Sequence, residues 1–160
     1  MNVSRVRLLT CVVLPLLTAC GTEPAGSVPA PAVTYTCCPA EDVDKLYRPG
    51  QTLTAHWAVE SAEQPGGTPP QVELTAHLTG PFATVADVKA AAEGVPAVAG
   101  LVTFTAAPVR PSGRADERPV STIVIGPDAK PGYYNLVTAV GDGDNAASGG
   151  ESIVRVVPSP

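Results

Sequence analysis

Residues 33–160 contain short runs of alternating hydrophobic and polar residues, separated by clusters of Gly, Pro, Asp and Asn. The clearest run covers residues 71–79, where Val72, Leu74, Ala76 and Leu78 alternate with polar residues. Such alternation places one face of a strand on a hydrophobic core and the other in water. The spacing of the runs therefore predicts an all-β domain. We expect seven strands, at residues 33–36, 52–60, 71–79, 101–105, 119–125, 133–140 and 152–157.

One segment between the third and fourth runs has a different pattern. Thr84 and Asp87 fit a capping box, three alanines follow, and Gly94 provides a stop signal. These signals predict one short helix from Val85 to Glu93. A helix of this length is marginal alone, so we expect Val85, Val88 and Ala92 to pack on an edge or end of the sheets.

The segment 125–136 carries a Pro-rich turn followed by Gly-x-Tyr-x-Leu. It resembles the junction between the fifth and sixth strands of immunoglobulin-like domains. The resemblance implies an antiparallel β-sandwich over residues 33–158, in which Tyr134 packs inward and its hydroxyl returns to the turn backbone. Trp57 on an early strand fits the same fold. The two cysteines that bridge the sheets of antibody domains have no counterpart here, so aliphatic side chains must hold the core.

The N-terminal pattern predicts an export signal. Arg5 and Arg7 precede an apolar stretch of about ten residues, which is too short to span a bilayer of ~30 Å as a helix. The sequence Leu17-Thr18-Ala19-Cys20-Gly21 that follows resembles a bacterial lipobox. That resemblance implies cleavage after residue 19, lipidation of Cys20 and attachment to the cell membrane on its extracytoplasmic face. An ordinary secretory signal or an uncleaved helix remains as an alternative.

Residues 21–32 are small, Pro-rich and without periodicity, as expected of a tether between lipid and domain. The chain carries 10 basic and 15 acidic residues, a net charge of −5 that argues against nucleic-acid binding. It has no Gly-x-Ser-x-Gly, no His-Glu-x-x-His and no phosphate-binding Gly-rich loop, so we do not expect an enzyme. No cofactor is implied, and we expect a monomer.

Cys37 and Cys38 are adjacent in the sequence. Consecutive Cα atoms are ~3.8 Å apart across a trans peptide, which is shorter than the usual disulfide range, so a bond between them strains the ring. Three interpretations stay open: a vicinal disulfide that locks the turn before the domain, free or intermolecular thiols, and a redox or soft-metal site. An oxidising exterior favours the disulfide.

Two further groups are candidate metal ligands. His56 and His77 lie on the polar faces of their expected strands and would share a metal if those strands form a hairpin; otherwise they are solvent-facing histidines without partners. Asp142 and Asp144 begin like a calcium loop, but the pattern fails at Ala146 and Ile153. The simpler interpretation of the stretch 142–150 is therefore a flexible, Gly-rich loop.

These observations predict a membrane-anchored, surface-exposed lipoprotein whose immunoglobulin-like domain is a non-catalytic binding or structural module. Its partner would be an envelope protein or polysaccharide. The alternative is a metal-binding or thiol-redox accessory lipoprotein that uses Cys37, Cys38, His56 and His77.

Overall fold

The computed structural model describes residues 33–61, 71–96, 99–114, 116–141 and 146–160. This part of the chain is mostly β-structure with two short helices, as the alternating pattern predicts. The elements in chain order are β1 (Val33–Thr36), α1 (Ala40–Val43), β2 (Leu46–Tyr47), β3 (Thr52–His56), β4 (Ala58–Ser61), β5 (Glu73–Phe82), α2 (Val85–Ala92), β6 (Val102–Thr105), β7 (Val120–Val124), β8 (Gly132–Gly141) and β9 (Ala146–Val156).

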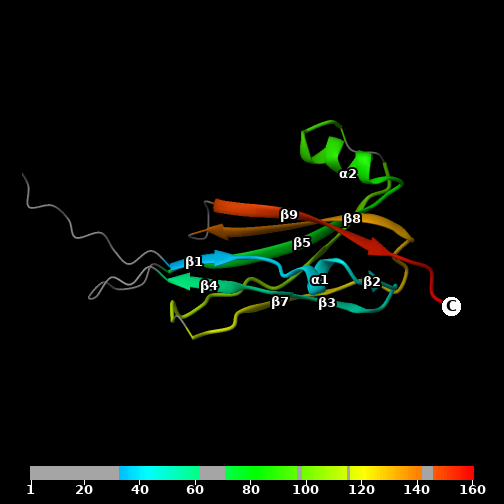
Figure 1. Ribbon diagram of the computed structural model, residues 1–160. Coiled ribbons are helices and arrows are strands. Elements are labelled where there is room, and N and C mark those ends of the chain that lie inside the picture. The colour runs from blue at the N-terminus through cyan, green and yellow to red at the C-terminus, as the bar shows by residue number, and fades with distance from the viewer. Residues whose placement is uncertain (1–32, 62–70, 97–98, 115, 142–145) are drawn as a thin grey trace, which may run out of the picture.

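The strands form two layers (Figure 1). One layer is a five-stranded sheet in the order β2-β9-β8-β5-β6, in which every pair is antiparallel except the parallel pair β2–β9. The other layer consists of two antiparallel pairs, β3–β7 and β1–β4. The parallel pair departs from the wholly antiparallel arrangement that the sequence predicts.

The hydrophobic core lies between the layers and draws on alternate residues of each strand. Leu53 and Ile123 from one layer are fully buried, as are Leu78 and Val154 from the other. The alternation in β5 is complete over its ten residues, with Glu73, Thr75 and His77 facing away from the core. The period-2 pattern therefore sets which face of each strand is buried, as a two-layer β structure requires.

The expected strand at residues 52–60 is interrupted at Trp57. β3 ends at His56 and pairs with β7, whereas β4 begins at Ala58 and pairs with β1. Trp57 itself still points inward and is only 3% exposed. The hydrophobic alternation is continuous across this point, so it could not reveal that the strand changes its partner.

The prediction of a flexible loop is wrong for residues 146–150, which belong to β9. Gly149 and Gly150 pair with Ala139 and Thr138 of β8. A Cβ atom on Gly149 would lie only 2.8 Å from the carbonyl oxygen of Thr138. Glycine is therefore required here because two strands approach closely, whereas in the sequence alone it predicts a loop.

Helix α2 begins with the predicted capping box. The Thr84 hydroxyl accepts from the Asp87 backbone N–H at 3.2 Å, and the Asp87 carboxylate accepts from the Thr84 N–H at 2.9 Å. The helix ends at Ala92, one residue before the predicted end, and packs against β8 and β5. Of the three side chains expected to pack, Val88 is buried whereas Val85 and Ala92 are exposed. Helix α1 and strand β2 were not predicted, because four and two residues are too few to show a period.

Tyr134 takes the position that the resemblance to immunoglobulin-like domains implies for it. Its ring is fully buried, and its hydroxyl donates to the Lys130 carbonyl oxygen at 2.8 Å. Burial raises the pKa of this hydroxyl above its ordinary value, and Asp128 adds to the effect. The side chain thereby ties the turn before β8 to the core.

We expect Tyr134→Phe to lower the free energy of unfolding by about 1 kcal/mol, because the Lys130 carbonyl loses its donor while the ring stays in place. Urea denaturation followed by fluorescence measures the change. Tyr133→Phe is the matched control, since Tyr133 is only partly buried and its ring lies under Arg155. Equal stability of the two variants would contradict a role for the Tyr134 hydroxyl.

Candidate functional site

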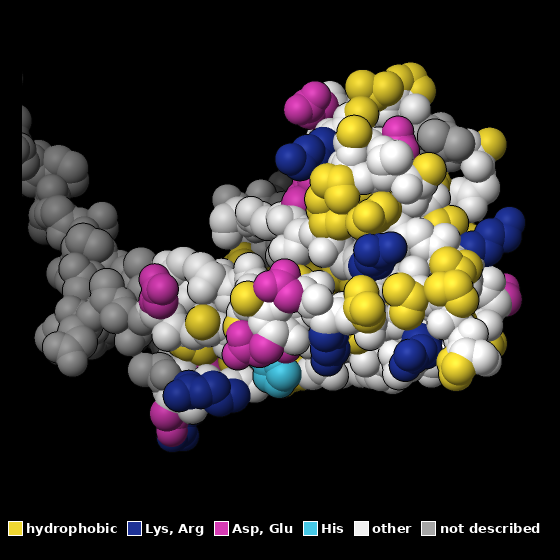
Figure 2. All heavy atoms as spheres, turned by 45° about the vertical axis from the view of Figure 1, so that its right-hand side comes forward, with side chains coloured by type: hydrophobic (Ala, Val, Ile, Leu, Met, Phe, Trp, Pro, Cys, Tyr) yellow, Lys and Arg dark blue, Asp and Glu magenta, His cyan; other side chains and the backbone are white. Residues whose placement is uncertain are grey.

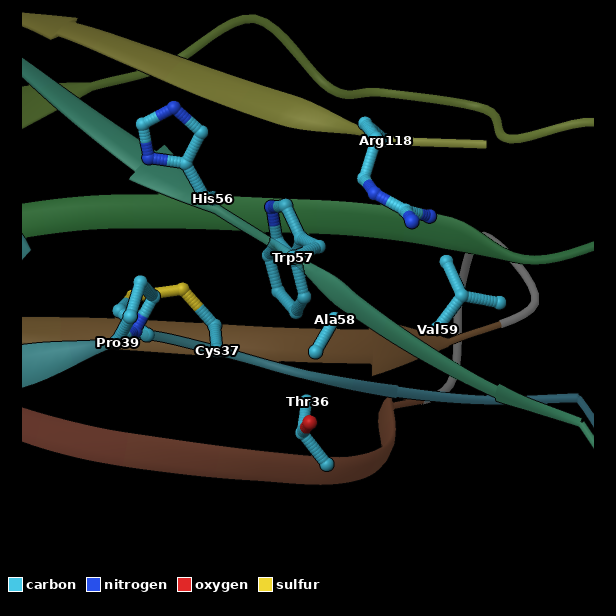
Figure 3. A pocket seen from close by; sticks show the side chains of 9 residues that line it. Thr36, Cys37, Pro39, His56, Trp57, Ala58, Val59 and Arg118 are labelled. Atoms are coloured by element: carbon cyan, nitrogen blue, oxygen red, sulfur yellow. A yellow bond between two sulfur atoms is a disulfide. The ribbon is translucent and has the colours of Figure 1, made fainter. Parts of the chain in front are cut away.

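The candidate site is a groove of about 690 Å³ in the layer that contains β3 and β4. Figure 3 shows its lining side chains, which come from the end of β1, the crossing from β3 to β4 and the segment before β7. The lining includes Cys37, Cys38, His56, Trp57, Ala58 and Arg118.

The groove forms where the strand changes its partner. The His56 backbone N–H donates to the Asp42 carboxylate at 2.8 Å, and the next N–H, that of Trp57, donates to the Pro119 carbonyl at 3.0 Å. Successive N–H groups of a strand point to opposite edges, so these two bonds hold α1 on one edge and the start of β7 on the other. The exposed Ala58 follows on the strand and lines the groove.

Cys37 and Cys38 are joined in a disulfide, with Cα atoms 3.1 Å apart. The peptide bond between them is cis, not trans as the sequence argument assumed. Both residues are partly buried and line the groove, and both pack against the core. The two cysteines therefore border the groove directly after β1.

His56 is held by a buried carboxylate. Its Nδ1 atom lies 2.9 and 3.0 Å from the two carboxylate oxygens of Asp42. The Asp42 side chain is 5% exposed whereas the His56 side chain is 55% exposed, so the pair reaches from the interior to solvent. Because a carboxylate accepts hydrogen bonds, Nδ1 carries a proton and donates it to Asp42.

Trp57 fixes the inner side of the same crossing. Its indole N–H donates to the Ser121 hydroxyl at 3.0 Å, and both side chains are buried. The hydrogen bond removes the cost of burying the indole N–H. Trp57 thus ties β7 to the strand crossing from within the core, while its own surface contributes to the groove.

Glu117 positions the segment that carries Arg118. Its carboxylate accepts from the Tyr35 hydroxyl at 2.7 Å, from the Ser112 N–H and hydroxyl at 2.8 Å each, and from the Gly113 N–H at 3.0 Å. Arg118 follows directly, is exposed and lines the groove. The anchored carboxylate therefore places a guanidinium group at the groove.

These bonds change two pKa values. Burial alone would raise the pKa of Glu117, but the hydrogen bonds from Tyr35, Ser112 and Gly113 together outweigh it and hold this pKa below its ordinary value. The pKa of the Tyr35 hydroxyl is raised well above its ordinary value, first by burial and then by its bond to Glu117. Both shifts favour a protonated tyrosine that donates to an ionised carboxylate.

The structure does not bring His56 and His77 together. His56 lies in β3 and His77 in β5, and these strands belong to different layers instead of forming a hairpin. Both side chains face away from the core, so they lie on opposite outer faces. Among the residues that the structure describes, no group of three or more His, Cys, Asp or Glu side chains is placed to hold a metal ion. The expectation of a shared metal therefore fails on topology.

Three other predicted positions lie outside the described residues: the lipidation site Cys20 and the calcium candidates Asp142 and Asp144. In the described part of the chain, no helix is both long and apolar enough to cross a bilayer.

Sequence reasoning missed Asp42, Glu117 and Arg118. Asp42 is the buried acid of a four-residue helix, for which the sequence gives no signal. The other two lie in the irregular segment before β7, which the contact of Tyr35 with Glu117, 82 residues apart, helps to place at the site. Figure 2 shows a histidine beside acidic side chains on the surface, with basic side chains on either side.

We expect the domain to lose stability as the pH falls below the ordinary pKa of Glu117, 4.5. A lowered pKa in the folded state means that the stabilisation is present above the unfolded value and is lost as protonation occurs. Glu117→Gln should reduce this acid dependence and lower the free energy of unfolding at neutral pH by about 1–3 kcal/mol. Urea denaturation across the acid range measures both effects.

The control for that experiment is Asp116→Asn, which removes a neighbouring, exposed carboxylate paired with Arg114. Exposed pairs contribute little, so this variant should follow the wild-type curve. An unchanged acid slope in Glu117→Gln would show that the Glu117 network does not stabilise the fold.

No family model and no curated protein matches the sequence. Among solved structures, the chain is similar to Spo0M, a sporulation control protein from Bacillus subtilis, with 14% sequence identity and a TM-score of 0.33. The aligned region covers 83% of this chain and 51% of that one, so the chain spans about half the length of Spo0M. A similarity this distant indicates neither fold nor function.

Proposed function

We propose that the chain is a membrane-anchored, extracytoplasmic lipoprotein whose immunoglobulin-like domain is a non-catalytic binding module. The observation that carries the binding role is the groove at the crossing from β3 to β4. The partner is an envelope protein or polysaccharide that enters this groove.

The anchoring half of the proposal rests on the N-terminal sequence. Arg5 and Arg7, the short apolar stretch and the lipobox-like segment around Cys20 occur in the order that lipoprotein signals require. Residues 21–32 provide a Pro-rich tether that would hold the domain away from the head groups. An acidic chain gains nothing from anionic lipids, so acyl chains on Cys20 would supply the attachment.

The immunoglobulin-like half is supported by the two strand layers and by Tyr134. The hydroxyl of this buried tyrosine returns to the turn backbone four residues earlier, at Lys130, which is the contact found at the tyrosine corner of such domains. Trp57 packs between the layers, as an early-strand tryptophan does in that fold.

The lining of the groove suits recognition of a ligand with both apolar and polar groups. The disulfide, Ala58 and Val59 provide apolar surface, while His56 and Arg118 provide polar groups. A concave, mostly apolar site with a few fixed polar groups is the usual form of a binding site. His56 is held by the Asp42 carboxylate, and the Arg118 side chain donates to the Glu117 carbonyl oxygen at 2.8 Å, so little ordering is needed on binding.

Metabolic labelling with an alkyne fatty acid tests the anchor. The wild-type protein should take up the label and remain with the membrane fraction, and Cys20→Ala should lose both properties because the acceptor thiol is absent. Cys11→Ala is the matched control and should be labelled normally, since Cys11 lies within the signal. A labelled Cys20→Ala protein would refute lipidation at this residue.

Saturable binding to isolated envelope fragments tests the groove, with Cys20→Ala as the starting protein so that membrane insertion does not contribute. Ala58→Trp fills the groove and should weaken binding by about tenfold or more. Thr122→Trp places the same side chain at an exposed position of β7 in the same layer and should bind normally. Equal binding by both variants would exclude the groove, and no saturable binding would exclude the binding role.

A further inference from the structure

We propose that the end of the domain that carries β2 is a second binding surface, and that its ligand is an anionic polysaccharide of the cell envelope. This surface, the basic end, consists of Lys45, Leu46, Arg48, Lys130 and Arg155, all of them exposed. It shares no residue with the lining of the groove. The inference rests on the proposed anchor for the place where the ligand is met, and it does not depend on the groove.

The register of the strands assembles the basic end. Leu46 of β2 lies opposite Arg155 of β9, and Arg155 lies opposite Tyr133 of β8. Neighbouring strands are about 4.8 Å apart, so these three residues form one row across the sheet. Leu46 is 59% exposed, Lys45 precedes it directly, and Arg48 follows two residues later. The row therefore combines an apolar side chain with basic side chains on β2 and β9.

The turn before β8 brings Lys130 to the same end. Gly132, the first residue of β8, pairs with Val156, the residue after Arg155. The Lys130 carbonyl accepts from the Tyr134 hydroxyl at 2.8 Å, which fixes the backbone of the turn. Figure 2 shows basic side chains at this end of the domain, with hydrophobic side chains between them.

Two of the four cations are held over tyrosine rings. Lys45 Nζ lies 4.9 Å from the centroid of the Tyr47 ring, and Arg155 Cζ lies 5.4 Å from that of Tyr133. Attraction between a cation and the face of a ring limits the positions that these long side chains adopt. Both side chains remain exposed, so their charges stay available to a ligand. A ligand therefore has less side-chain freedom to remove when it binds.

The cations at the other end of the domain are already paired. The Arg110 guanidinium lies 2.8 Å from the Glu73 carboxylate, and that of Arg114 lies 3.0 Å from the Asp116 carboxylate. In the part of the chain that the structure describes, none of the four cations of the basic end forms an ion pair. The positive charge that can attract an anionic ligand is therefore concentrated at one end.

An anionic polymer matches this distribution of charge. The chain has a net charge of −5, so most of its surface repels a polyanion and the basic end attracts one. Asp44 and Asp128 are exposed near this end, but the four cations outnumber them. A sugar ring also presents C–H groups, which can cover the exposed Leu46. Negative groups on a sugar chain therefore fit the basic end better than a neutral polysaccharide does.

The position of the basic end favours a polysaccharide over the lipid surface. In Figure 1 the chain enters β1 at the end of the domain opposite β2. With the proposed anchor attached ahead of β1, the basic end faces away from the membrane. It would therefore meet polymers that lie outside the membrane before it meets lipid head groups.

The experiment measures binding of the Cys20→Ala chain to immobilised carboxymethyl-dextran, with uncharged dextran as the matched polymer. The chain should bind saturably to carboxymethyl-dextran but not to dextran, and added salt should weaken the binding because it screens the charges. Replacing two cations of the basic end, by Lys45→Gln with Arg155→Gln, should weaken binding by about tenfold or more.

The matched control is Arg110→Gln with Arg114→Gln, which removes the same charge from paired positions and should bind as the starting chain does. Circular dichroism checks that both double variants are folded. An equal loss of binding in the two would overturn the basic end, because net charge alone would then explain the binding. Absence of saturable binding to carboxymethyl-dextran would also overturn it.

Two further measurements identify other ligands and other sites. Tighter binding to phosphatidylglycerol vesicles than to carboxymethyl-dextran would overturn the polysaccharide and indicate a lipid surface. Ala58→Trp, which fills the groove, should leave binding to carboxymethyl-dextran unchanged. Loss of binding in this variant would overturn the basic end and place the polymer in the groove, so failure of this proposal is distinguishable from failure of the groove as a binding site.

Discussion

The arrangement depends on two backbone N–H groups that point in opposite directions. The His56 N–H is satisfied by a buried carboxylate, and the Trp57 N–H by a carbonyl group before β7. If β1 simply continued beside β3, the first N–H would bond to a strand carbonyl, and no space would open at this point. The chain instead turns through the disulfide into α1, so that a side chain, Asp42, takes the place of a strand partner. A backbone N–H that is withdrawn from water must be paired, and this requirement places the acid against the histidine.

The sequence predicted well whatever is determined by neighbours along the chain. The alternation in β5, the capping box at Thr84 and the inward position of Tyr134 all follow from local periods or local motifs. Each of these features places a side chain relative to its own backbone. The hydrophobic pattern therefore located most strands and their buried faces, although it did not fix where each strand ends.

The pairing of strands and the candidate site could not be predicted in the same way. Whether His56 and His77 meet depends on which layer β3 and β5 join, and two alternating runs look the same in either arrangement. Gly149 is ambiguous in the sequence as well, since a glycine there indicates either a loop or a close contact between two strands. Asp42, Glu117 and Arg118 reach the site through contacts between distant segments, and no spacing along the chain records such contacts.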